Sequence, residues 1–197
     1  AIAASERVFE FLAEEEEVET AKEGVTTDHA QGNIEFDHVH FGYNKDKIII
    51  NDFSAKVKKG SKIAIVGPTG AGKSTMIKLL MRFYDVNSGS IKVDGTDIRD
   101  FKREDLRSLF GMVLQDTWLF SGTIMDNVRY GKLDATLDEV RAACKTASVD
   151  HFIKTLPDGY NMIINEDADN ISGGQKQLLT IARVILANPK IVILDEA

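Results

Sequence analysis

Several absences exclude whole classes of protein for this sequence. It contains a single cysteine, Cys144, so no internal disulfide can form, and this indicates a reducing compartment. We expect that thiol to be a small core residue. No apolar run approaches the roughly 18–20 residues that a membrane-spanning helix needs, and the first residues lack the pattern of a signal peptide. The sequence also contains no internal repeat and no low-complexity segment.

Basic residues are too few for a general nucleic-acid binder. Acidic side chains outnumber Lys and Arg by 31 to 24, which gives a formal net charge of −7. Proteins that bind nucleic acids without sequence preference usually have a basic surface, so we expect no nucleic-acid partner. The 197 residues, 43% of them hydrophobic, are enough for one well-buried domain, or for a core with a small appendage.

The first part of the chain changes from a helical pattern to short strands. Residues 1–19 have apolar side chains at helical spacing and predict a helix, whose glutamates at 14–17 we expect to face solvent. Residues 20–32 contain glycines and threonines and predict a linker. Turn residues separate the apolar stretches that follow, so short strands are predicted at 34–36, 39–41, 48–57 and 90–93.

The last part of the chain predicts helices and one more strand. Thr136 and Glu139 have the spacing of a capping box, which opens a helix. A second helix is predicted to start at Gly174 and to end before Asn188. Residues 191–194 are all apolar and predict a fully buried strand.

A phosphate-binding pattern, G-x-x-x-x-G-K-[ST], lies at residues 67–75. A strand is predicted before it at 62–66 and a helix after it at 73–83, which is the context that this pattern needs. Glycines let backbone N–H groups converge on phosphates, and the helix presents its positive end to them. The residues expected to bind a nucleoside triphosphate here are Gly67, Pro68, Thr69, Gly70, Ala71, Gly72, Lys73, Ser74 and Thr75.

Five side chains near this loop have distinct expected roles. Lys73 would reach the β- and γ-phosphates, Ser74 would ligate Mg²⁺, and Thr75 would contact the α-phosphate. Asp195 and Glu196 follow the last apolar strand, where an open α/β sheet places its ligand chemistry. Asp195 would hold Mg²⁺ through water, and Glu196 would polarise the attacking water. The alternative is that both carboxylates are solvent-facing charges at a strand end.

A second motif lies at residues 171–175, at the start of the last predicted helix. Small residues at a helix start expose backbone N–H groups, which would make a second phosphate site, although Ser172 alone would be explained as a helix N-cap. Placed between a phosphate loop and Asp-Glu, this motif resembles the signature of ATP-binding-cassette (ABC) ATPases. The residues that carry the resemblance, and that we expect to contact nucleotide, are Ser172, Gly173, Gly174 and Gln175.

The resemblance covers residues 33–197 and implies a fold and cofactors. The implied fold is an α/β P-loop NTPase (RecA-like) core with an antiparallel β subdomain and an inserted α-helical subdomain at about residues 122–172. The implied cofactors are ATP and Mg²⁺. In this family ATP is held between two copies of the domain, and the signature motif addresses the γ-phosphate of ATP on the partner copy.

Two further residues match the family's nucleotide site. Tyr43 matches the aromatic residue that stacks on adenine, and such stacking is worth about 1–3 kcal/mol per base. The alternative for Tyr43 is a half-buried strand aromatic. Gln115 matches the glutamine that ligates Mg²⁺ and couples the nucleotide site to the transmembrane partner. This assignment rests wholly on the alignment of motifs.

Other segments resemble a particular group of ABC proteins. Residues 118–127 resemble the stretch after that glutamine in exporters whose membrane and ATPase domains share one chain. Residues 156–160 and Glu166 resemble the segment of the same group that contacts the membrane domain. The usual glycine of that segment is Ala168 here, which puts the contact in doubt, and the leading signature leucine is Ile171.

The same resemblance implies what surrounds this chain. Residues 1–24 match the end of the last membrane-domain helix with its linker, which implies a membrane domain in the same full-length chain. The implied location is the cytoplasmic face of a bacterial cell membrane. The family continues past Asp-Glu-Ala with a partner-contacting loop and a γ-phosphate histidine, and His29, His38, His40 and His151 do not match that histidine. We therefore expect a chain truncated at both ends, weakly active or inactive by itself.

Three functions are compatible with these motifs. The leading hypothesis is an ATP-hydrolysing motor that dimerises around ATP and drives export across a membrane. An alternative is a soluble ABC ATPase acting on ribosomes or nucleic acid, although only 104 residues separate Gly67 from Ile171, too few for the coiled coils of chromosome-maintenance relatives. A third is a nucleotide-gated partner subunit that does not hydrolyse ATP. Such subunits typically lack the glutamate that this chain has as Glu196.

Overall fold

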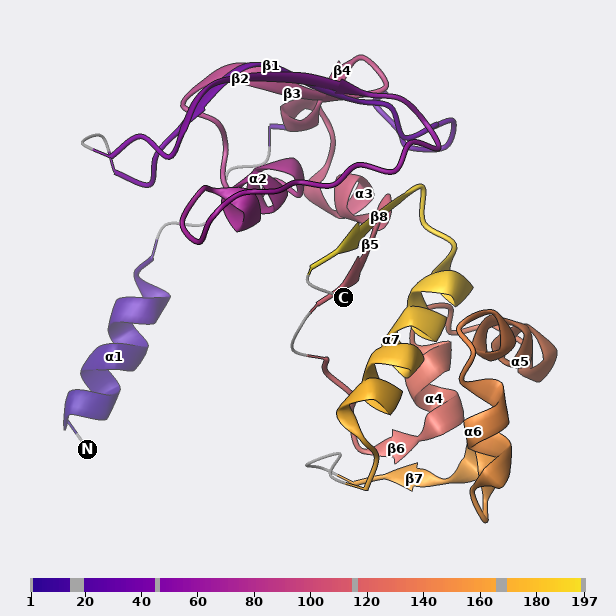
Figure 1. The fold of residues 1–197 in the computed structure, drawn as a ribbon. Coiled ribbons are helices and arrows are strands. Elements are labelled where there is room, and N and C mark those ends of the chain that lie inside the picture. The colour runs from indigo at the N-terminus through magenta and orange to yellow at the C-terminus, as the bar shows by residue number, and fades with distance from the viewer. Residues whose placement is uncertain (1, 15–19, 45–46, 115–116, 166–169, 196–197) are drawn as a thin grey trace.

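The computed structural model describes residues 2–14, 20–44, 47–114, 117–165 and 170–195, which form two hydrophobic cores (Figure 1). One core lies between an antiparallel sheet and two helices, and the other lies among helices. This mixed α/β arrangement agrees with the fold class expected from the sequence. Among the described residues, no helix is both long and apolar enough to cross a bilayer.

The antiparallel sheet covers one side of the first core, and two helices pack against it with their buried leucines (Figure 1). Its strand order is β2-β1-β3-β4. The strands are β1 (Ile34–Phe41), β2 (Ile50–Val57), β3 (Ser88–Val93) and β4 (Thr96–Asp97). The helices beneath the sheet are α2 (Lys73–Leu80) and α3 (Arg103–Ser108), with the short 3₁₀ helix η1 (Ile98–Asp100) before α3.

The strands predicted at 34–36 and 39–41 are one strand, β1, interrupted by a β-bulge. Its register against β2 shifts between Phe36 and Val39, and His38 has φ of +47°. A bulge lets buried side chains stay on one face although the spacing between them changes from two residues to three. Phe36 and Val39 accordingly both point into the core. The sequence identified both apolar stretches and missed their continuity.

The second core is helical and contains most of the chain after Trp118. Its helices are α4 (Ile124–Arg129), α5 (Leu137–Thr146), α6 (Asp150–Thr155) and α7 (Gly173–Ala187), with the 3₁₀ helix η2 (Gly159–Asn161). Two short strands, β6 (Gly122–Thr123) and β7 (Ile163–Ile164), pair at one end. The capping box predicted at Thr136 and Glu139 is confirmed, and α7 ends at Asn188 in the left-handed conformation.

Cys144 is fully buried in the helical core, as the sequence predicted. Burial raises the pKa of its thiol to about 11. The hydroxyl of Tyr160 lies beside this thiol. Tyr160 Oη donates a hydrogen bond of 2.7 Å to Asp150. Lys154 Nζ contacts the same carboxylate at 2.7 Å, and this hydrogen bond is the first cause of the lowered pKa of Asp150. These groups stabilise the core and lie outside the two cavities described below.

A two-stranded parallel ladder joins the two cores. It consists of β5 (Phe110–Val113) and β8 (Ile191–Leu194), in register from the first residue to the last. Helix α7 packs closely on β5, since a Cβ added at Gly111 would lie 2.6 Å from Pro189 Cγ and 2.7 Å from Val184 Cγ1. The packing of α7 on β5 therefore sets the position of the C-terminal end of α7, from which the chain continues into β8.

One strand prediction is wrong in this structure, and the predicted burial of another strand is wrong. Residues 62–66 form no strand, and the side chain of Val66 is 86% exposed. Residues 191–194 do form β8, but they are not fully buried, since Leu194 is 61% exposed. Residues of both segments line one cavity of about 850 Å³. No described strand pairs with either of the edges that face this cavity.

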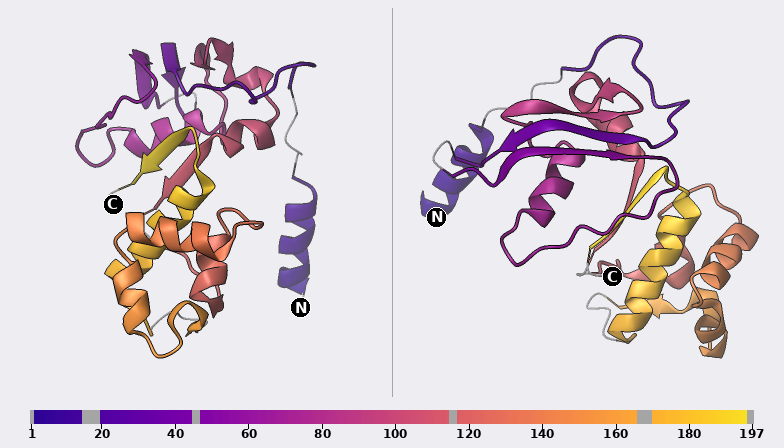
Figure 2. Two further views of the ribbon diagram at one scale, coloured as in Figure 1. Left: turned by 90° about the vertical axis from the view of Figure 1, so that its right-hand side faces the viewer. Right: turned by 45° about the horizontal axis from the view of Figure 1, so that its top comes forward.

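The predicted N-terminal helix is shorter than residues 1–19. Helix α1 spans Ile2–Leu12, and residues 15–19 lie outside the described part. Its described side chains from Ser5 onward are exposed, including Phe9 at 68% and Phe11 at 78%. Two further views show α1 standing apart from both cores (Figure 2). Helix α2 is also shorter than the predicted range 73–83, since it ends at Leu80.

The close approach of α4 and α7 depends on Gly131. A Cβ at Gly131 would clash with the backbone carbonyl oxygen of Arg183, and backbone cannot rotate away as a side chain can. We expect Gly131→Ala to lower the free energy of unfolding by roughly 1–3 kcal/mol, because overpacking forces a backbone shift. Urea unfolding would measure it. Gly173→Ala is the matched control, since a Cβ there meets nothing within 4 Å. Equal stability of the two variants would contradict the prediction.

Candidate nucleotide-binding site

The phosphate loop leads into the first turn of α2. Gly70 has φ of +84° and Gly72, at the helix N-cap, has φ of +88°, in the region that glycine enters without steric cost. No side chain caps this helix start, so its first N–H groups stay available to a ligand. Lys73 Nζ donates to the carbonyl oxygens of Gly67 at 2.6 Å and Pro68 at 3.1 Å. The loop thus wraps around its own lysine.

Two of the predicted metal ligands lie at the same cavities. Ser74 and Asp195 both line the cavity of about 850 Å³, together with Lys73 and Thr75. Ser74 and Asp195 also line a second cavity, of about 450 Å³. A hydroxyl and a carboxylate oxygen are hard ligands, and Mg²⁺ usually takes one or two protein ligands beside phosphate oxygens and waters. The donor set therefore fits Mg²⁺ bound together with a nucleotide.

The parallel ladder explains how distant residues reach this place. Val113 pairs with Leu194, and the amide of Asp195 donates to the carbonyl of Val113 at 2.9 Å. The carboxyl ends of β5 and β8 therefore lie side by side, where an open α/β sheet binds its ligands. Gln115 and Glu196, predicted to act here, lie outside the described residues. Each comes at most two residues after one of these strand ends.

Tyr43 lies beside the phosphate loop. Its hydroxyl is 3.3 Å from Thr75 Oγ1, and its side is held by edge-on contacts with Phe41 and Tyr84, each at 5.1 Å between ring centroids. The residue is 44% exposed, so one part of the ring stays open. Tyr43 is thus a half-buried aromatic residue that also exposes part of its ring beside the loop. Sequence reasoning missed Tyr84, because no spacing rule connects it to Tyr43.

The signature motif lies at the opposite end of α7 from Asp195. Helix α7 has 15 residues, about 22 Å at 1.5 Å per residue, and its C-terminal end leads to β8 (Figure 1). Ser172 accepts from the Gln175 amide at 3.3 Å, and Gln175 Oε1 accepts from the Ser172 amide at 2.8 Å. Ser172 is therefore a helix N-cap in a capping box. Neither cavity at the phosphate loop is lined by these residues.

Packing gives no reason for the two glycines of this motif. A Cβ at Gly173 or Gly174 would meet nothing within 4 Å, and neither has a positive φ. Glycine inside a helix costs roughly 1 kcal/mol relative to alanine. Within the described chain these positions therefore lose stability and gain no contact. They leave the backbone of the first two residues of this capped helix without side chains over it.

The fold and the loop define a P-loop nucleotide-binding domain. The family model described as ABC transporter matches residues 50–197, and the chain belongs to that family. It is 50% identical over 196 residues to a "Fatty acid ABC transporter ATP-binding/permease protein" of Mycobacterium tuberculosis (strain CDC 1551 / Oshkosh), covering all of this chain and 31% of that protein. It is 49% identical over 197 residues to the "Putative multidrug export ATP-binding/permease protein YgaD" of Bacillus subtilis (strain 168), covering all of this chain and 34% of that protein.

A solved structure supports the same placement. The "Structure of a bacterial Atm1-family ABC exporter with ATP bound" matches with a TM-score of 0.87 and 39% identity, covering 99% of this chain and 34% of that chain. The chain spans about a third of the length of the curated relatives it matches. The solved structure is named an exporter and the two relatives above are named ATP-binding/permease proteins, and none of the three is named for action on ribosomes or nucleic acid.

Proposed function

We propose that this chain is the ATP-binding and ATP-hydrolysing motor domain of a membrane exporter. The observation that carries the proposal is the meeting of Lys73, Ser74 and Asp195 at one cavity, with the signature motif at the far end of α7. Such an arrangement leaves the nucleotide site without its signature half. A second copy of the domain, identical or homologous, would supply that half.

In this proposal the chain's own groups share the work of binding. The N–H groups at the start of α2 and the Lys73 ammonium hold the β- and γ-phosphates. Tyr43 receives the adenine. Ser74, Gln115 and Asp195 would hold Mg²⁺, which would supply positive charge to offset the charge of the phosphates. Glu196 takes a proton from the attacking water as general base.

The open glycines support a head-to-tail dimer. Because Gly173 and Gly174 meet nothing in their own chain, a phosphate of nucleotide bound to the partner copy can approach their backbone closely. ATP then binds the closed pair more tightly than the open one, so it shifts the population toward the closed pair. Hydrolysis removes the bridging γ-phosphate and lets the pair reopen.

The relatives support a place at a membrane. Two of them are named ATP-binding/permease proteins, and each is about three times as long as this chain. We propose that residues 33–197 are the nucleotide-binding domain, with a helical subdomain at about 122–172. Residues 1–24 would join it to a membrane domain in the same protein, at the cytoplasmic face of a bacterial membrane. The exported substrate would be chosen by that membrane domain.

Fractionation tests this function directly. Expressed with its natural flanking sequence, the protein should sediment with membranes and hydrolyse Mg-ATP in detergent. Ribosome co-sedimentation that persists after membranes are dissolved would instead support the ribosome-acting class. A membrane-bound protein that binds ATP and shows no turnover would support the non-hydrolysing partner subunit.

A further inference from the structure

A buried arginine lies directly after the helix that carries the phosphate loop. Arg82 follows α2 with φ of +55°, and its side chain is 0% exposed. The amide of Phe83 donates to the carbonyl of Lys78 at 2.8 Å, and the amide of Arg82 donates to that of Leu79 at 3.0 Å. This is the pattern of a helix end whose left-handed residue is usually glycine. Because arginine is strained in this conformation, the contacts of its side chain give the reason that it occupies the position.

The guanidinium of Arg82 joins three separate segments. Nε donates to Asp85 at 3.1 Å, Nη1 donates to the carbonyl of Phe101 at 3.1 Å, and Nη2 donates to Thr20 Oγ1 at 2.6 Å. A buried charge is tolerated when it is paired and hydrogen-bonded. Here Asp85 is a local partner, whereas Phe101 and Thr20 lie 19 and 62 residues away in the sequence. Thr20 lies 62 residues away, in the segment that enters the domain after α1.

Thr20 is held on both sides of its hydroxyl. It accepts from Arg82 and donates to the carbonyl of Arg99 at 2.7 Å. Two residues later, Lys22 is anchored on the same turn, with its amide and its Nζ each 2.8 Å from oxygens of Asp100. Lys22 thus contacts η1, through Asp100 at the surface. Thr20 instead connects to the C-terminal end of α2, through its hydrogen bond with Arg82.

We propose that Arg82 and Thr20 are positioning residues of the nucleotide site, joining the entering segment to the phosphate-loop helix. This inference rests on the proposed function. Helix α2 has eight residues, about 12 Å at 1.5 Å per residue, with Lys73 at one end and Arg82 just past the other. So short a helix moves as one unit, so a displacement of Thr20 shifts Lys73 and Ser74. By linkage, ATP on those residues must in turn order the segment at Thr20.

Hydrogen exchange of the unmodified full-length protein tests this coupling. Mg-ATP should slow amide exchange in residues 67–80, which reports nucleotide binding. It should also slow exchange in residues 20–25 by roughly fivefold or more, if the two places share a coupling of ordinary size. Protection at 67–80 without any at 20–25 overturns the coupling and leaves the function standing. No protection at either place overturns the proposed function instead.

Three variants separate positioning from general stability. Thr20→Val keeps the shape and removes the hydroxyl, and we expect the Kd for Mg-ATP to rise about fivefold or more. Thr20→Ser restores the hydroxyl and should restore the Kd. Lys22→Met removes the surface ion pair of the same segment and should change the Kd by less than about twofold, as exposed pairs contribute little. A Thr20→Val protein that binds ATP as Lys22→Met does would overturn the inference.

Discussion

Glu196→Gln should lower ATP turnover by about 100- to 10,000-fold, the usual contribution of a positioned general base. The amide keeps the size of the carboxylate but cannot accept the proton of the attacking water. Binding should survive, because the phosphate contacts come from α2 and its loop. Single-turnover hydrolysis and Mg-ATP titration of the full-length protein would measure the two effects separately.

The same substitution tests the dimer. With hydrolysis blocked and ATP present, the nucleotide-binding domains should remain closed as a pair, which cross-linking between the signature motif and the phosphate loop of the partner would detect. Glu104→Gln is the matched control, an exposed acid in the first turn of α3 that lines neither cavity. Turnover within tenfold of the unmodified protein would place the base elsewhere. A Glu196→Gln protein that binds ATP without pairing would refute the shared site.

Lys73→Met should weaken Mg-ATP binding by about 10- to 150-fold. The estimate follows from the loss of one charge-assisted hydrogen bond, worth roughly 1.5–3 kcal/mol, at about 1.4 kcal/mol per tenfold. Methionine keeps the apolar stem and removes the ammonium that now donates to the carbonyls of Gly67 and Pro68. Calorimetric titration of nucleotide would measure the change.

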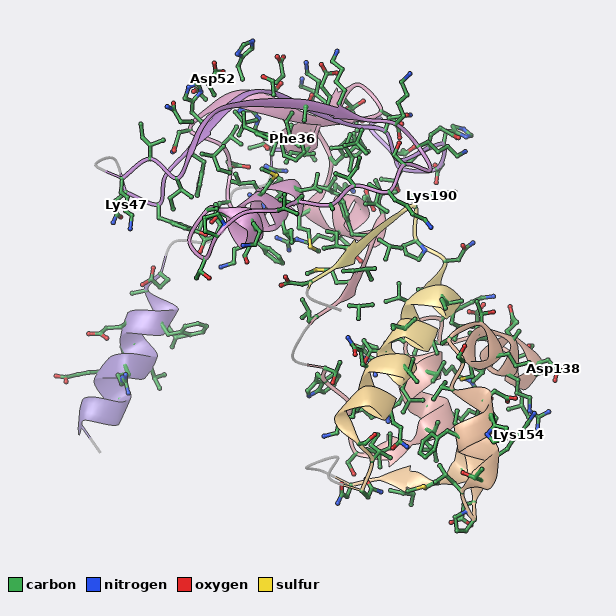
Figure 3. The ribbon with its side chains drawn as sticks, viewed as in Figure 1. Phe36, Lys47, Asp52, Asp138, Lys154 and Lys190 are labelled. Carbon is green, nitrogen blue, oxygen red and sulfur yellow. The ribbon has the colours of Figure 1, made fainter. Side chains whose placement is uncertain are left out.

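The control for this variant is a lysine at a different turn. Lys190 lies between α7 and β8, away from the phosphate loop, and is exposed (Figure 3). Lys190→Met removes the same charge from the molecule, so it corrects for any effect of net charge on nucleotide affinity. If both variants lose affinity equally, the lysine of the loop has no special role. If Lys73→Met binds normally, the loop does not hold the β- and γ-phosphates.

Local chemistry in the sequence predicted the starts of α2, α5 and α7 well, whereas α1 and α2 end earlier than predicted. A glycine pattern followed by a helical stripe requires few distant contacts, and α2 begins at Lys73, within that pattern. The capping boxes at Thr136 and Ser172 are satisfied within four residues. The sequence predicted the first as a capping box and offered Ser172 as an N-cap. Segment 62–66 is the counterexample. Its apolar residues predict a strand, but a strand needs a partner, and none of the described strands pairs with it.

The sequence alone contains the patterns on which the proposed function depends: a glycine loop before a helix, two carboxylates after an apolar strand, and a glycine-rich helix start. These are short patterns whose meaning depends on neighbours along the chain. Which of these patterns meet in space depends on contacts between elements far apart in the sequence. The parallel register of β5 and β8 brings Asp195 to Ser74, while the length of α7 keeps Ser172 away. The link from Arg82 to Thr20 is likewise visible only in space, because it spans 62 residues and depends on burial.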